Sequence, residues 1–493
     1  MKKIIMFLVD AMMPAVLESC VAKEKTRALK FLMDHGQYIR DCVTVFPTMT
    51  ASIDCSIVTG EYPDVHKVPG LVWYDPEEQT IVNYFNGMSP VMAVGLDKCA
   101  HNVLYGLNEK HLSKKIKTIY EEIEERGLTA GSINVIAHRG HQYYTPKLPT
   151  VLNMATNFCL KEKVSGPSIM SLGKLVSPAI FRQSPWSWAH SAMESLGIND
   201  RYAIDVLLEV IKSGKQPDFT FVYLPDNDHM LHKDPAEAES FLEDVDQQFV
   251  RFLDSFDSWQ QAIERNIILV ISDHGQTLIG PTEDHNIPLE QLLADFSIYP
   301  LGEELREHHE IVICNNERMT YVYPLHENLQ NRIIRSLSSE TRIDLIAWKE
   351  DKRACVMSTA TQQILSFTKQ GPYQDCYGQT WSISGNWDVL DLKQDTQGTI
   401  WFDNYPDALS RLYGSLFSQE IPLIVITAAP MYEFKSDCSP THLNGGSHGS
   451  LHRQDSLVPL LVVGATQPIR QPVRLIDLKP LILQELTHQT VLV

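Results

Sequence analysis

The chain has 493 residues, of which 44% are hydrophobic and 21% are charged. This composition is typical of a globular protein and excludes a disordered or fibrous chain; the length suffices for one large α/β domain and a second unit. Asp and Glu number 61 against 42 Lys and Arg, so the formal net charge is −19. We therefore expect no binding to duplex nucleic acid or to a membrane surface, and a phosphate-bearing ligand would need locally bound cations.

Nine cysteines are spread between Cys20 and Cys438 without a Cys-x-x-Cys pair. This pattern argues against a disulfide framework or a cysteine zinc site, and it favours free thiols in a reducing compartment. The amino-terminal apolar run is interrupted at Asp10, so it is shorter than the core of a signal peptide. The sequence has no apolar run long enough to span a bilayer. We expect a cytoplasmic protein.

The first half of the chain alternates predicted strands and helices. An apolar strand is predicted at 4–9, and a helix at 112–126 is followed by Gly127, a suitable helix end, and by a strand at 132–136. Another strand is predicted at Phe219–Leu224. This order of strand, loop and helix is typical of an α/β fold with a mostly parallel, doubly wound sheet.

A long amphipathic helix is predicted next, before a further strand at 267–271. Its apolar residues fall at helical spacing, which indicates packing in the core rather than ligand binding. The stripe consists of Phe241, Val245, Phe249, Phe252 and Phe256.

The pattern changes after His285, where charged pieces and strand-like segments surround a stretch with Trp and Gly at 373–387. We interpret residues 286–403 as an inserted cap or subdomain. The core would then consist of a first part, 1–285, and a closing part, 404–493. In the closing part we predict core strands at 421–427 and 457–464, and a helix at 475–486.

Carboxylates and imidazoles follow several of the predicted strands. Parallel sheets carry their chemistry at the carboxyl ends of the strands. Three carboxylates and three imidazoles suit two divalent metal ions, with Zn²⁺ favoured and Mn²⁺ as the harder alternative. The candidate ligands are Asp10, Asp228, His232, Asp273, His274 and His448. For Asp273 and His274 alone, an ordinary polar turn after a buried strand is an equally good interpretation.

Thr50 is the candidate nucleophile. It lies in a segment, 45–60, where a hydroxyl at the start of a helix would meet backbone N–H groups and the positive end of the helix dipole. A phosphoryl oxygen would bind at such a place. Without the metal ligands, Thr48 or Thr50 would more simply be a helix cap.

The chain resembles the alkaline phosphatase superfamily, and most closely its type I phosphodiesterase and nucleotide pyrophosphatase branch. The resemblance covers nearly the whole chain apart from the inserted region, and the motifs occur in the order of the family. It implies an alkaline phosphatase-like α/β/α sandwich with an inserted cap. The motifs are Phe46-Pro47-Thr48-Met49-Thr50, Ile57 to His66, Tyr223 to His232, Ser272-Asp273-His274-Gly275 and Ser447-His448-Gly449.

The resemblance also implies a division of the ligands between two metals. One metal would be held by Asp10, Thr50, Asp273 and His274, and the other by Asp228, His232 and His448. The branch's spacing Asp-x-x-x-His favours Asp228 over Asp226, and Asp226 and His229 remain the local competitors. For four other histidines we expect structural or substrate-proximal roles: His66, His285, His442 and His452.

Coordination to a divalent ion would make the Thr50 hydroxyl reactive at neutral pH. The implied reaction is attack of Thr50 on phosphorus, followed by hydrolysis of the phosphothreonine by water at the second metal. The substrate would be a small phosphate ester, most simply a diester or pyrophosphate. A phosphomonoesterase, a phosphonate hydrolase and a sulfatase are alternatives within the superfamily, although the Cys/Ser-x-Pro/Ala-x-Arg motif of sulfatases is not evident around Thr50. A non-catalytic protein that binds metal or phosphate is the alternative from another class.

The sequence departs from the branch at Leu71, where an asparagine commonly contacts a phosphate oxygen. The backbone N–H of Thr50 or Ala51 could still face the phosphoryl group. Trp73 and Tyr74 either stack on an aromatic leaving group or pack under the inserted region. The preference for diesters is therefore open, and the sequence does not indicate an oligomeric state.

Overall fold

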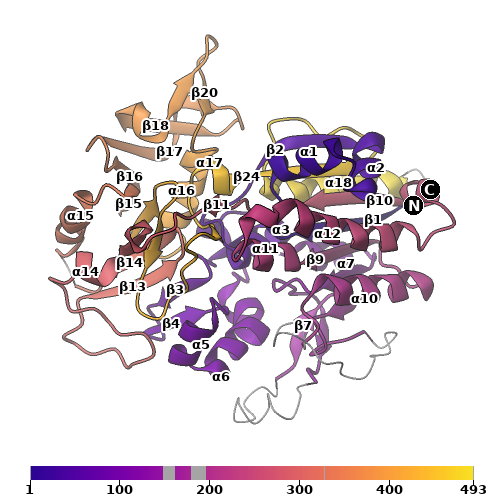
Figure 1. Ribbon diagram of the computed structural model, residues 1–493, viewed down its shortest axis with the longest axis horizontal. Helices are drawn as coiled ribbons and strands as arrows, with labels where there is room; N and C mark the ends of the chain where they lie inside the picture. The colour runs from indigo at the N-terminus through magenta and orange to yellow at the C-terminus, as the bar shows by residue number, and fades with distance from the viewer. Residues whose placement is uncertain (1, 148–161, 179–195, 327, 492–493) are drawn as a thin grey trace.

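Figure 1 shows two units, each built around its own β-sheet. The structure is a computed structural model, and the residues described are 2–147, 162–178, 196–326 and 328–491. Cys159 lies outside them, and the other eight cysteines are free thiols. Among the helices described, none is both long and apolar enough to span a membrane.

The first unit contains a seven-stranded sheet. Five neighbouring strands, from β10 to β8, run parallel, while β24 is antiparallel to both of its neighbours. The predicted α/β fold with a mostly parallel sheet is therefore confirmed. In spatial order the strands are β2 (Gln37–Val43), β24 (Leu457–Val463), β10 (Asn266–Ile271), β1 (Lys3–Val9), β9 (Phe219–Leu224), β5 (Ala130–Ile133) and β8 (Ile169–Ser171).

Helices cover both faces of this sheet. Alternate residues of β1 enter different hydrophobic clusters: Ile4 packs on one face and Ile5 on the other, because successive side chains of a strand point in opposite directions. One face is covered by α3 (Thr50–Thr59), α7 (Ile119–Glu125) and α18 (Leu478–Val491). The other is covered by α1 (Pro14–Ala22), α2 (Arg27–His35), α10 (Asp200–Lys212), α12 (Ala238–Leu253) and α13 (Trp259–Arg265). The result is an α/β/α sandwich.

The second unit contains a nine-stranded sheet, drawn from red to orange in Figure 1. Helix α16 (Ala408–Leu416) packs on the face that also contacts Phe46 and Val72 of the first unit. Helices α14 (Leu289–Leu292) and α15 (Gln330–Ser338) cover the opposite face. The strands are β13 (Ile311–Asn316), β14 (Met319–Pro324), β21 (Ile424–Ala428), β15 (Ile343–Glu350), β16 (Arg353–Ser358), β17 (Ile364–Asp375), β18 (Thr380–Gly385), β20 (Thr399–Phe402) and β19 (Leu392–Gln394).

One predicted strand lies in a different sheet from the one we expected. The segment at 421–427 was expected to rejoin the core sheet, but it forms β21, which pairs with β14 and β15 of the second sheet. The apolar run of β21 gives no information about its partner, because any buried central strand has this composition. The division at residues 285 and 403 stays a prediction, although the second sheet extends beyond residue 403.

The remaining predicted elements are present with shifted ends. The helix predicted at 112–126 is shorter: α7 begins at Ile119, and Thr118 before it forms a capping box with Glu121. The strand predicted at 132–136 is β5, which begins earlier, at Ala130. The phenylalanine stripe lies on α12 except for Phe256, which follows the end of the helix, and Val245, Phe249 and Phe252 are buried as predicted.

Candidate metal centre and nucleophile

The candidate ligands gather at the carboxyl edge of three adjacent strands, β10, β1 and β9. Asp10 directly follows β1, and Asp273 and His274 come just after β10. Asp228 lies in α11 (Asp226–Leu231), the short helix that follows β9, and His232 caps this helix. The sheet order therefore brings together carboxylates that lie more than two hundred residues apart in the sequence.

The first ligand set surrounds the imidazole of His274. Its Nε2 lies 3.4 Å from Asp10 Oδ1 and 3.5 Å from Asp273 Oδ2. Thr50, the first residue of α3, donates a hydrogen bond of 3.4 Å to Asp273 Oδ2. The structure thus places all four residues expected at the first metal in one group.

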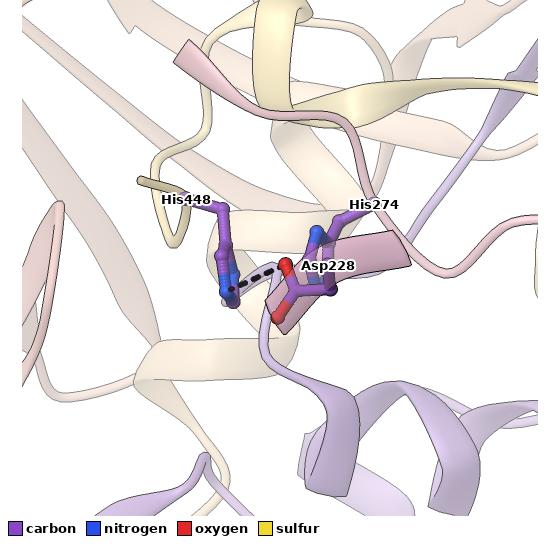
Figure 2. Close-up of side chains that lie close together, drawn as sticks. All are labelled: Asp228, His274 and His448. Carbon is purple, nitrogen blue, oxygen red and sulfur yellow. Dashed lines mark ion pairs between the residues drawn. The ribbon is translucent and has the colours of Figure 1, made fainter. Parts of the chain in front are cut away.

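The second ligand set lies beside the first. His232 Nε2 is 3.1 Å from Asp228 Oδ2, and His448 Nε2 is 3.9 Å from Asp228 Oδ1. His448 follows the short strand β23 (Gly446–Ser447), and its ring stacks on that of His274 with the centroids 3.6 Å apart. Figure 2 shows Asp228, His274 and His448 pointing toward one another from separate segments.

The three imidazoles share one hydrogen-bonding pattern. In each ring Nδ1 meets a backbone carbonyl: Gly446 O for His232 at 2.8 Å, Gly275 O for His274 at 3.1 Å, and Thr48 O for His448 at 2.6 Å. A carbonyl can only accept, so Nδ1 carries a hydrogen, and Nε2 is the ring atom that is left to bind a metal. This is the arrangement that holds a histidine ligand for a metal.

The buried polar atoms of the first ligand set suit a divalent cation. Among the described residues, Asp10 Oδ1 and His274 Nε2 are buried without a hydrogen-bond partner. Burial raises the pKa of Asp10 well above its usual value, and the nearby carboxylates of Asp273 and Asp228 raise it further. A cation would pair with these atoms and relieve the repulsion between the carboxylates.

In the second ligand set, Asp228 and His232 form an ion pair. Burial alone would raise the pKa of Asp228, but the imidazoles of His232 and His448 outweigh burial and hold it well below the usual value. Burial would lower the pKa of His232, yet the Asp228 and Glu317 carboxylates raise it to about 10. A metal ion would replace the proton of His232 as the positive charge.

The competing residues have other partners. Asp226 Oδ2 accepts from the backbone N–H of Asp200 at 3.1 Å, which ties it to the start of α10. His66 is fully buried and lies 2.9 Å from the Ser56 hydroxyl, and burial lowers the pKa of His66 to about 3. His285 stacks on Tyr432, and His452 caps α17 (Arg453–Ser456). These contacts are structural.

Three of the expected substrate-binding residues have packing or backbone roles. Trp73 lies edge-on to His111, and Tyr74 packs near Tyr323, both in hydrophobic clusters. The backbone N–H of Leu71 donates to Asn316 Oδ1 at 3.0 Å. Ala51 is buried in the first turn of α3.

Two further residues lie beside this centre, and the sequence did not indicate either of them as a ligand. Glu317 and His442 lie with His232 in a group whose ligand atoms are all within 4.8 Å of one another. Glu317 occupies the turn between β13 and β14 of the second sheet, where no motif singles it out. His442 was expected to have a structural or substrate-proximal role, and only the folded chain shows its position next to His232.

The α/β/α fold, with carboxylates and imidazoles gathered at the carboxyl ends of its central strands, has the arrangement that the resemblance to the alkaline phosphatase superfamily implies. A profile of the type I phosphodiesterase/nucleotide pyrophosphatase family matches residues 4–451, so the chain belongs to this family of enzymes that hydrolyse phosphate esters. No curated protein matches the chain in sequence.

Two kinds of solved structure are similar to it. Murine ectonucleotide pyrophosphatase/phosphodiesterase 5 is 13% identical, with a TM-score of 0.58, and the match covers 99% of this chain and 95% of the murine chain. Phosphonoacetate hydrolase from Sinorhizobium meliloti, in complex with phosphonoformate, is 17% identical with a TM-score of 0.54 and the same coverage. These likenesses confirm the fold.

Proposed function

We propose that the chain hydrolyses phosphate diesters or pyrophosphates at a centre of two divalent metals, with Thr50 as the nucleophile. The observation that carries this proposal is the position of Thr50, at the start of α3 and within hydrogen-bond reach of Asp273 in the first ligand set. Asp10, Asp273, His274 and Thr50 would hold one ion, and Asp228, His232 and His448 the other. Imidazole and carboxylate ligands favour Zn²⁺, with Mn²⁺ as the alternative.

Divalent ions held by these residues would supply positive charge to the phosphoryl oxygens and lower the pKa of the Thr50 hydroxyl. Thr50 Oγ forms a bond to phosphorus while the P–O bond to the leaving group breaks, and the proton of the Thr50 hydroxyl ends on the leaving alkoxide of a diester or the leaving phosphate of a pyrophosphate. Backbone N–H groups of Thr50 and Ala51, at the positive end of the α3 dipole, stabilise the phosphoryl oxygens. Water then hydrolyses the phosphothreonine and restores the hydroxyl.

Hydrolysis of a phosphonate is the second candidate. The likeness to phosphonoacetate hydrolase supports it, and Leu71 lacks the side-chain donor that an asparagine at this position offers to a phosphate oxygen. In either case we propose a small-molecule substrate. The cytoplasmic location remains our proposal from the cysteine pattern.

The test compares the wild type with Thr50→Ala and Thr50→Ser. Rates are measured on a bis-aryl phosphate, an aryl phosphate, an aryl sulfate and phosphonoacetate, and metal content is measured on the same samples. We expect Thr50→Ala to abolish turnover with metal content largely kept, and Thr50→Ser to keep part of the activity, because its hydroxyl remains. Undiminished turnover by Thr50→Ala would refute the assignment, and a preference for phosphonoacetate would establish the second candidate.

A further inference from the structure

A turn of the second sheet reaches into the metal centre of the first unit. Its three consecutive residues each bind the first unit: Asn316 Oδ1 accepts from Val72 N at 2.9 Å, Arg318 N donates to His448 O at 2.9 Å, and Glu317 accepts from His448 N at 3.3 Å. Gly449 allows this close approach, because a Cβ there would lie 2.5 Å from Asn316 O. The turn is therefore fixed against the loop that carries a predicted metal ligand.

Glu317 is buried at this contact, with 5% of its surface exposed. Its φ of 62° lies in the left-handed region, which residues other than glycine seldom adopt. Glu317 Oε2 accepts from Ser447 Oγ at 3.0 Å and lies 3.6 Å from His448 Nε2. A buried carboxylate needs hydrogen bonds and positive charge around it, and a metal ion at the second ligand set would supply that charge to Glu317.

His442 faces the same place from the other side. Its ring stacks on His232 with the centroids 4.3 Å apart. Its Nδ1 lies 2.9 Å from Oε2 of Glu433, which is fully buried, and its backbone N–H donates to the same carboxylate. The carboxylate makes Nδ1 the donor and leaves Nε2 free, a pairing that commonly holds a metal-binding histidine in position.

We propose that Glu317 and His442 complete the ligand set of the second metal, beside Asp228, His232 and His448. Their ligand atoms lie within 4.8 Å of one another and of His232. This inference rests on the proposed function, since it assumes a metal at the second set. It makes the centre composite, because the second sheet contributes one of the ligands.

The added carboxylate also bears on the substrate. With both metals bound, Asp10, Asp228, Asp273 and Glu317 would contribute four negative charges, which match the charge of two divalent ions. A neutral centre attracts a dianionic monoester less strongly than a cationic centre does. It therefore favours a diester, which carries a single negative charge. Removing the charge of Glu317 should shift the preference toward monoesters.

The test uses Glu317→Gln, because glutamine can still accept the hydrogen bonds from Ser447 and His448 N–H but carries no charge. Glu310→Gln is the matched control. Glu310 lies just before the first residue of β13, at the end of the strand opposite to Glu317, and it accepts a hydrogen bond from Ser297 N at 2.9 Å. The full-length variants are dialysed against buffered Zn²⁺, and bound metal is measured by mass spectrometry. The ratio of diester to monoester hydrolysis is then determined for each sample.

We expect the wild type and Glu310→Gln to bind two ions. Glu317→Gln should bind the ion of the second ligand set at least about tenfold more weakly. Its ratio of diester to monoester hydrolysis should also be lower. His442→Gln should weaken the same ion. Unchanged zinc affinity in both Glu317→Gln and His442→Gln would overturn the inference and leave the two-metal hydrolase intact. A wild type that binds no metal, or that turns over no phosphorus ester, would instead overturn the proposed function.

Discussion

Arg318 and Asp455 form the buried ion pair that holds the turn of the second sheet against the first unit. Both side chains are fully buried, and Arg318 Nη1 lies 2.5 and 2.6 Å from the two carboxylate oxygens. Nη1 also donates to Thr277 Oγ1 at 2.8 Å. Replacement of Arg318 by Met would leave the Asp455 charge buried and without its partner. Removal of one member of a buried pair costs about 3–5 kcal/mol.

We therefore expect Arg318→Met to lower the free energy of unfolding by about 3–5 kcal/mol and to reduce turnover, because Glu317 is the neighbouring residue. The double variant Arg318→Met/Asp455→Leu should recover part of the loss, since it leaves no unpaired charge. Urea unfolding of the holoenzyme, followed by fluorescence and circular dichroism, measures both. Coincident transitions by the two probes are needed to extract a single free energy.

Arg332→Met is the control. Arg332 lies 3.8 Å from Glu310, and these side chains are 48% and 30% exposed, so we expect a change below about 1 kcal/mol. A loss below about 1 kcal/mol for Arg318→Met, or a double variant no more stable than Arg318→Met alone, would refute the reasoning.

Two further predictions concern pH and metal. Burial raises the pKa of Asp407 from 3.8 to about 6, although Arg474, Tyr62 and Ser410 act in the opposite direction. Because the folded protein binds this proton more tightly than the unfolded chain, the stabilisation is complete below pH 4 and is lost as the pH rises through 6. Relative to Asp407→Asn, the wild type should lose up to about 3 kcal/mol over this range in urea unfolding; a pH-independent difference would contradict this. Removal of metal by a chelator should abolish turnover and lower the melting temperature, and Zn²⁺ or Mn²⁺ at a hundred times its Kd should restore about 2.7 kcal/mol; unaffected turnover after verified metal removal would contradict it.

The sequence predicted the part of the site that follows from strand ends. Asp10 and Asp273 each come after an apolar run, and the parallel order of β1 and β10 brings them together. Helical stripes likewise predicted α12, because burial on one face produces a period that is visible in the sequence.

The rest depended on tertiary contacts that have no local signal. Glu317 lies in a turn between two strands, and its place in the centre results from the docking of the second sheet. The sheet that receives β21 is likewise set by its partners β14 and β15, not by its own residues. Trp73 packs in the hydrophobic cluster of the first sheet and Tyr74 in that of the second, and a role for either in substrate binding stays a prediction.

The stereochemical course at phosphorus tests the central claim most directly. The substrate is a diester phosphorothioate of known configuration, hydrolysed by the metal-loaded enzyme in ¹⁸O-labelled water so that the phosphorus of the product stays chiral, and the configuration of the product is determined. Attack by Thr50 and then by water gives two in-line displacements, each of which inverts the phosphorus centre. We expect net retention. Net inversion would show a single displacement by water and would contradict a phosphothreonine intermediate.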